Sequence, residues 1–217
     1  MELDRFGGDA DPPLLFVLGW GNRPDHAPVR WLIDRLVEDG WYVHTATLPV
    51  HVTDAGSEWI RPVERYADGL ADPAILGHSV GGLTVAHAGL DARTTTYLSP
   101  WWRLPPATDG PLVDLLARVP TDRKVVPLGM VDAELLGDHA TARQVADSPD
   151  RVSPAFLRTV RWAHRNVPDI NEDAVVFCSL SDRVISTRAI GERVPSDRVV
   201  LYAGGHELFS SPTRDRH

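Results

Sequence analysis

The chain has 217 residues, 43% of them hydrophobic, so it can bury a sizeable core as one α/β domain or two small ones. Its net charge of −8 and the lack of a basic patch argue against a nucleic-acid partner. The single cysteine, Cys178, excludes an intramolecular disulfide, and its apolar surroundings in the sequence favour a buried strand thiol.

The first residues are acidic and lack the basic and apolar regions of a secretory signal. No apolar run approaches the length that spans a bilayer. We therefore expect a cytoplasmic protein without an integral membrane segment.

Apolar runs that fit buried strands alternate along the chain with segments of helical period. The predicted strands are 14–18, 42–48, 74–76, 95–98, 174–178 and 199–202. Between the first two strands, residues 26–40 place apolar side chains on one helical face and end at Gly40. Segments 57–70 and 83–92 flank the third strand in the same way. This alternation predicts a mostly parallel, doubly wound sheet with flanking helices.

The regular alternation stops between the fourth and fifth predicted strands. Two arginine-bearing helical patterns, 111–119 and 153–167, surround the segment 132–148 there. Long insertions in compact α/β domains are usually functional, often as lids, although part of this one could be an ordinary crossover helix. We expect a single domain over 1–217 with a small helical cap inserted at about 100–171.

A glycine-rich turn follows the strand at 74–76. The sequence Gly77-His78-Ser79-Val80-Gly81 fits the G-x-S-x-G nucleophile elbow, in which a sharp strand-to-helix turn strains the serine backbone. Glycines let the neighbouring chain pass closely, and the N–H of Val80 at the helix start can face a developing oxyanion. The pattern predicts Ser79 as a nucleophile; the alternative is a helix N-cap in a glycine-rich turn.

A serine hydroxyl needs a base, and the base is usually oriented by an acid. His206 follows the last predicted strand, where the alternative is an ordinary loop histidine. Asp182 follows the strand before it, whereas Asp173 and Asp197 precede strands and belong at the opposite edge of the sheet. Asp182 could instead be a helix N-terminal acid or half of a surface ion pair. The order Ser79, Asp182, His206 is that of the α/β hydrolases.

These motifs resemble the α/β-hydrolase superfamily, and the resemblance covers nearly the whole chain. The stretch LLFVLGWGN resembles the HGWG-type oxyanion loop of the cofactor-free esterases, with Leu18 in place of the histidine. SDRVIS resembles the acid loop, and GGHELF resembles the histidine loop, including a Glu207 that also occurs in lipase-like members. By this resemblance, Trp20 supplies the second oxyanion N–H beside that of Val80.

The resemblance implies the α/β-hydrolase fold and a serine hydrolase that cleaves a carboxylic ester, or a thioester, through an acyl-enzyme. It implies no cofactor, and the adjacent tryptophans and prolines in 101–106 favour an apolar small-molecule acyl substrate. We expect no metal, because no His, Cys or carboxylate cluster has ligand spacing. Trp101 and Trp102, at the start of the predicted cap, are candidates for the wall of an acyl pocket, and packing of the cap onto the domain is the alternative.

Two other classes of protein remain as alternatives. Gly19-Trp20-Gly21 follows a strand and precedes a helix, as in dinucleotide-binding proteins. However, Pro24 stands at the third glycine position and no acid ends the next strand. A non-catalytic ligand-binding protein on the hydrolase scaffold is the second alternative, because a fold alone does not establish an activity.

Overall fold

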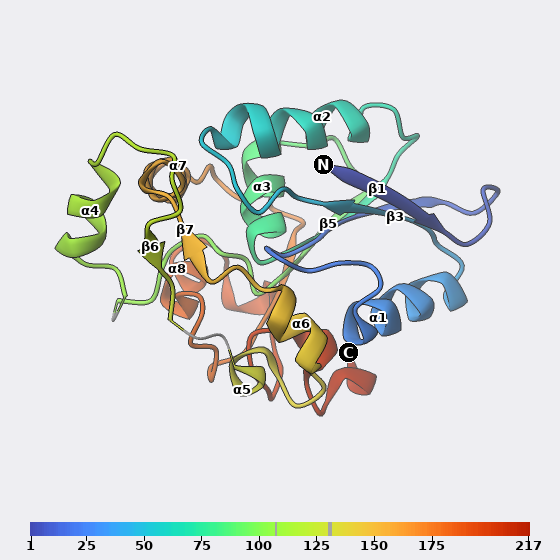
Figure 1. The fold of residues 1–217 in the computed structure, drawn as a ribbon. Coiled ribbons are helices and arrows are strands. Elements are labelled where there is room, and N and C mark those ends of the chain that lie inside the picture. Colours follow the sequence, from blue (N-terminus) through green and yellow to red (C-terminus); the bar gives the residue numbers. More distant parts are fainter. Residues whose placement is uncertain (107, 130–131) are drawn as a thin grey trace.

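The centre of the molecule is a seven-stranded sheet with the strand order β1-β3-β2-β4-β5-β8-β9 (Figure 1). The computed structural model describes residues 1–106, 108–129 and 132–217. The strands are β1 (Glu2–Phe6), β2 (Pro13–Val17), β3 (Tyr42–Thr47), β4 (Ala74–His78), β5 (Thr94–Leu98), β8 (Val175–Cys178) and β9 (Val199–Leu201). Strand β1 runs antiparallel to β3, and the other neighbouring pairs are parallel. The mostly parallel sheet predicted from the sequence is confirmed.

All six predicted strands are present; β1 of the central sheet and the two-residue strands 126–127 and 151–152 of a small second sheet were not predicted. Strand β1 lies at the edge of the sheet, and four of its five residues are exposed. Its sequence ELDRF carries charges at three positions, which suits an edge strand and hides the strand signal. The strand missed in the central sheet is therefore one with no fully buried residue.

The central strands are buried on both faces. Leu15 and Val17 of β2 pack into the core on one side of the sheet, and Leu14 and Phe16 pack into the core on the other side. This alternation follows from the two-residue period of a strand and explains why β2 is apolar throughout.

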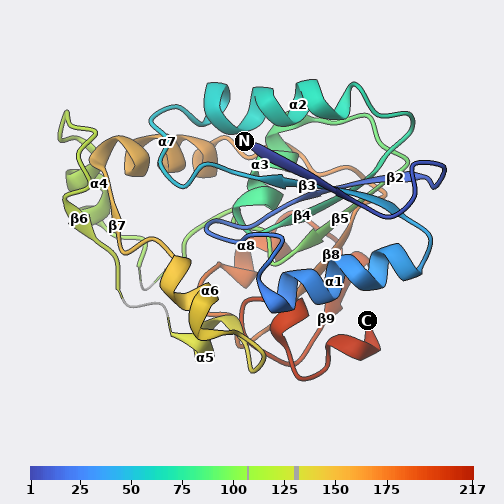
Figure 2. The same ribbon diagram turned by 45° about the vertical axis from the view of Figure 1, so that its right-hand side comes forward.

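Helices cover both faces of the sheet (Figure 2). One face carries α1 (Ala27–Glu38) and the 3₁₀ turn Leu208–Ser210. The other face carries the π-helical turn Gly56–Ile60, which continues into α2 (Arg61–Ala67), together with α3 (Val80–Ala88) and α7 (Pro154–Arg165). The remaining elements of the C-terminal part are α8 (Thr187–Gly191) and the 3₁₀ turns Ser196–Arg198 and Arg214–Arg216. The predicted doubly wound arrangement is confirmed.

Residues 99–174, here called the inserted segment, connect β5 to β8. The segment contains α4 (Pro111–Ala117), β6 (Val126–Pro127), α5 (Ala133–Leu136), α6 (Ala142–Asp147), β7 (Arg151–Val152) and α7. Residues 107, 130 and 131 of the predicted cap lie outside the described residues. The two predicted arginine-bearing helices are α4 and α7, and the buried side of α7 belongs to the same core cluster as α3.

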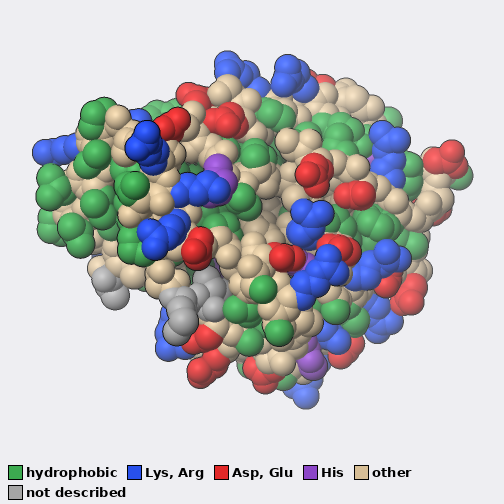
Figure 3. Space-filling view, viewed as in Figure 1, with side chains coloured by type: hydrophobic (Ala, Val, Ile, Leu, Met, Phe, Trp, Pro, Cys, Tyr) green, Lys and Arg blue, Asp and Glu red, His purple; other side chains and the backbone are tan. Residues whose placement is uncertain are grey.

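Helix α4 leaves two large hydrophobic side chains exposed. Leu112 and Leu115 are 65% and 61% exposed. Hydrophobic side chains gather over this lobe, on the left of Figure 3. Arg161 of α7 pairs with Asp109 and, at 2.6 Å from Nη2 to Oδ1, with Asp114, so ion pairs join α4 to the body of the protein. Among the described residues, no helix has the length and apolar character needed to cross a membrane.

We predict that Trp102→Ala strongly destabilises the fold. Trp102 is fully buried and packs edge-on against Tyr97, with ring centroids 5.1 Å apart. Truncation of a buried tryptophan costs about 3–5 kcal/mol. Urea unfolding measures the loss, with Trp162→Ala as the control because the Trp162 side chain is half exposed. Equal losses in the two variants would contradict the assignment of Trp102 to the core.

Candidate active site

Ser79 sits in a strained turn between β4 and α3. Its backbone has φ 52° and ψ −115°, a positive-φ conformation that residues other than glycine rarely adopt. The glycines on either side have no room for a side chain: a Cβ on Gly81 would lie 2.1 Å from the carbonyl oxygen of Val17, and one on Gly77 would lie 2.9 Å from Cα of Gly82. The glycine spacing of the motif therefore follows from close backbone packing around the serine.

Hydrogen bonds to β5, to the loop after β5 and to α3 hold the Ser79 backbone in this conformation. Its N–H donates to the carbonyl of Leu98 at 3.0 Å, and its carbonyl accepts from the N–H of Trp101 at 3.0 Å and of Leu83 at 3.1 Å. Strained backbone persists where the surroundings fix it from several directions. The turn is thus a rigid platform for the side chain.

The structure brings together the three residues predicted as a triad. The Oγ of Ser79 lies 2.9 Å from Nε2 of His206, and Nδ1 of His206 lies 2.8 Å from Oδ2 of Asp182. A carboxylate only accepts hydrogen bonds, so Nδ1 carries the proton and Nε2 is free to accept the one from the serine hydroxyl. This arrangement can withdraw the hydroxyl proton and stabilise the resulting imidazolium.

The charge state of the site follows from burial and pairing. Burial acts to lower the pKa of His206, but the charge and hydrogen bond of Asp182, with a further contribution from the charge of Glu207, leave that pKa raised above its usual value. The pKa of Asp182 is lowered: burial opposes this, but His206 and the N–H groups of Val184 and Ile185 stabilise the carboxylate. The site therefore holds an ionised acid beside a base of increased basicity.

The two residues predicted as oxyanion donors line the same cavity as Ser79. Val80 is the first residue of α3, where N–H groups have no partner within the helix. Trp20 lines the same cavity as Ser79, and its ring is fixed by stacking on Phe156 and by a 2.9 Å hydrogen bond from Nε1 to the carbonyl of Val50. Leu18, which stands where the HGWG-type oxyanion loop has a histidine, is fully buried in the core.

A cavity of about 360 Å³ opens above Ser79. Its walls are largely apolar and come mainly from the inserted segment; they include Trp101, Leu104, Val113, Leu128, Phe156 and Val160. The two predicted pocket tryptophans separate here. Trp101 lies in the cavity wall, whereas Trp102 belongs to the core and is not among the residues that line the cavity.

Several polar residues of the site were not predicted from the sequence. Asn22 and His78 line the cavity beside the triad, and Gln144 bonds to Glu207 behind it. Burial, and secondarily the charge of His206, hold the pKa of His78 well below its usual value, so this ring stays neutral. For Asn22 and Glu207 the signal was their place in the GWGN and GGHELF motifs, but nothing local in the sequence marks Gln144.

Within residues 1–106, 108–129 and 132–217, no group of three or more His, Cys, Asp or Glu side chains is arranged to hold a metal ion.

Comparisons with known proteins show the fold. A monoacylglycerol lipase from Paleococcus ferrophilus is 21% identical, with a TM-score of 0.73 over 98% of this chain and 93% of that one. A soluble variant of the monoglyceride lipase from Saccharomyces cerevisiae, in complex with a substrate analog, is 16% identical, with a TM-score of 0.72 over 98% and 86%. An esterase from Exiguobacterium antarcticum is 15% identical, with a TM-score of 0.66 over 99% and 91%.

No protein-family model and no curated protein matches the sequence. The structural likeness nevertheless spans nearly the whole of each chain, and the sheet order and helix layers agree with it. The chain has the α/β-hydrolase fold, as the resemblance of its motifs implied.

We predict that Asp182→Asn lowers the pKa of His206. The charged carboxylate and its hydrogen bond raise that pKa against the effect of burial, and an amide supplies no charge. An NMR pH titration of the His206 ring measures the shift. Asp173→Asn and Asp197→Asn serve as controls, because both of these aspartates are exposed. A His206 pKa unchanged in Asp182→Asn would contradict the pairing.

Proposed function

We propose that the protein is a serine hydrolase that cleaves a carboxylic ester of an apolar acyl group. The observation that carries the proposal is the continuous hydrogen-bonded chain Ser79–His206–Asp182 at the base of a largely apolar cavity. The lipases and esterases with the same fold support it. A thioester uses the same chemistry and is the second candidate for the scissile bond.

The first half-reaction uses His206 as a general base. Its Nε2 takes the proton of Ser79 as Oγ attacks the acyl carbon. The N–H groups of Trp20 and Val80 donate hydrogen bonds to the carbonyl oxygen and stabilise its negative charge. When the tetrahedral intermediate collapses, the ester bond breaks and the alcohol leaves with the proton held by His206. Asp182 stabilises the imidazolium between these transfers.

The second half-reaction repeats these steps with water. His206 takes a proton from the water as its oxygen attacks the acyl-enzyme, and Oγ of Ser79 then leaves with that proton. The products are a carboxylic acid and the free enzyme. No cofactor enters this sequence.

The apolar walls of the cavity favour an apolar acyl group as the part of the substrate that binds there. Apolar ligand surface gains about 25 cal/mol per Å² when it leaves water for such walls. We propose that α4 and the residue after β6 act as a cap over this cavity, since Val113 of α4 and Leu128 lie in its wall. The acyl chain then lies between the cap and α7.

Ser79→Ala tests the nucleophile. We expect hydrolysis of nitrophenyl and thioester substrates to fall by about six orders of magnitude, with residual rate left by the oxyanion donors. Circular dichroism should show an unchanged fold, because only one hydroxyl is removed. Near-normal turnover by the purified variant would refute the proposed role, and an inactive wild type would favour a non-catalytic binding protein on this fold.

Trp101→Ala tests the acyl pocket. Because the ring lies in the cavity wall, we expect kcat/KM to fall more for medium-chain esters than for acetate esters, with each lost methylene contact worth about 1–3 kcal/mol. Steady-state kinetics over a series of acyl lengths measure this. An equal loss for all chain lengths would show that Trp101 supports the fold and does not bind the acyl chain.

A further inference from the structure

The short helices α5 and α6 of the inserted segment contact the loop that carries His206. The N–H of His206 donates to the carbonyl of Leu135 at 2.9 Å, and the N–H of Glu207 donates to the carbonyl of Leu136 at 2.9 Å. Gly205 fits against the same backbone, because a Cβ there would lie 2.7 Å from the Leu135 oxygen. The histidine loop is therefore bonded directly to a part of the chain some seventy positions earlier.

The side chain of Glu207 continues this contact inside the protein. Glu207 is 1% exposed, and its carboxylate accepts hydrogen bonds from Nδ2 of Asn22 at 2.9 Å, from Nε2 of Gln144 at 2.7 Å and from Oγ of Ser210 at 2.6 Å. These donors are amides and a hydroxyl, so the carboxylate is held by neutral groups. A buried carboxylate is costly unless such bonds are made, so each donor has a fixed place.

Gln144 of α6 joins three parts of the site. One of the two Nε2 protons can be shared between the two oxygens of Glu207, and the other can be donated to Oδ1 of Asn22 at 2.9 Å. Asn22 lies two residues after Trp20 in the loop that follows β2, and its Nδ2 lies 3.4 Å from Nδ1 of His78. One amide group thus connects the histidine loop, the Trp20 loop and the inserted segment.

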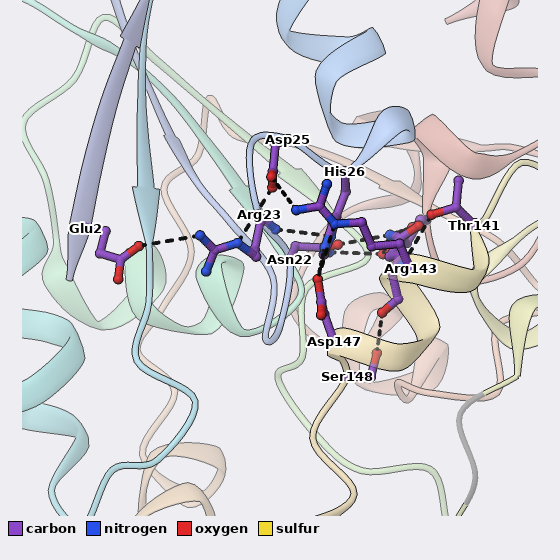
Figure 4. Close-up of polar contacts among 11 residues, drawn as sticks. Glu2, Asn22, Arg23, Asp25, His26, Thr141, Arg143, Asp147 and Ser148 are labelled. Atoms are coloured by element: carbon purple, nitrogen blue, oxygen red, sulfur yellow. Dashed lines mark hydrogen bonds and ion pairs between the residues drawn. The ribbon is translucent and has the colours of Figure 1, made fainter.

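Outside this buried network, a second set of contacts holds α6 against residues 22–26 (Figure 4). The Nε2 of His26, a buried residue, lies 2.9 Å from Oδ2 of Asp147, and Arg143 pairs with Asp25 and Asp147. The Arg143 pairs involve exposed side chains and contribute little. The buried network is therefore the stronger constraint on where α6 lies.

We propose that Gln144 is a positioning residue, which holds Glu207 and Asn22 so that α5 and α6 form a fixed wall of the active site. The inference rests on the proposed serine-hydrolase function. Within the inserted segment, residues 132–149 then support the catalytic loops as well as lining part of the cavity, whereas α4 covers the cavity. Movement of α6 would leave a buried carboxylate without two of its donor contacts, so this part does not swing open as a lid.

Gln144→Leu tests the proposal, because leucine has a similar size and no donor. We expect kcat to fall by about 100-fold, the cost of a small misplacement of reacting groups, while KM stays within about twofold. Gln144 is not among the residues that line the cavity, so its loss removes no substrate contact. The matched control is Arg143→Leu on the same helix, whose side chain is 60% exposed and which should keep wild-type kinetics.

A second measurement does not depend on turnover. The proton on Nδ1 of His206, hydrogen-bonded to Asp182, gives a downfield NMR signal whose exchange with water reports how firmly the ring is held. We expect this exchange to accelerate in Gln144→Leu but not in Arg143→Leu. If Gln144→Leu does not fold, Glu207→Gln preserves the side-chain shape, removes the carboxylate acceptor and should give the same two effects.

An unchanged kcat and unchanged proton exchange in a folded Gln144→Leu would overturn the positioning role. So would a change confined to KM, or equal effects in Arg143→Leu. A wild type that hydrolyses no ester or thioester but still shows the exchange difference would refute the proposed function while leaving the positioning of His206 intact.

Discussion

The backbone of Ser79 is the constraint on which the rest of the site depends. A non-glycine residue in such a conformation costs about 1–3 kcal/mol, and it persists here because β4 lies between β2 and β5 and the neighbouring glycines admit close contact on both sides. The turn places Oγ at the carboxyl edge of the sheet, beside the point where the strand order reverses between β2 and β4. The other functional groups come from loops at that same edge.

Two buried carboxylates stabilise the opposite sides of the histidine loop. Asp182 bonds to the His206 ring, and Glu207 anchors the backbone that follows it to α6 and to the loop after β2. Buried charges are tolerated only when their hydrogen bonds are complete, so both carboxylates restrict the geometry of the loop. One inserted segment thus supplies both the apolar cavity walls and the polar support of the histidine loop, and Leu135 and Leu136 belong to both.

The sequence predicted the sheet, the two layers of helices and the residues that meet at Ser79, because these depend on local patterns: apolar runs, helical period and glycine spacing. It missed β1, whose exposed edge position leaves no apolar run. It also grouped Trp101 with Trp102, since adjacent residues in a loop carry no signal of which ring faces the cavity. Gln144 could not be found, because its partners lie 63 and 122 positions away in the chain and the bonds form only after folding.

Covalent labelling by a fluorophosphonate tests the central claim most directly, because the probe reacts with a hydroxyl only where a base activates it. Intact-mass analysis followed by peptide mapping locates the adduct. The account predicts one adduct per chain, on Ser79, and none in Ser79→Ala. A folded wild type that remains unlabelled, or that is labelled at another residue, would contradict it.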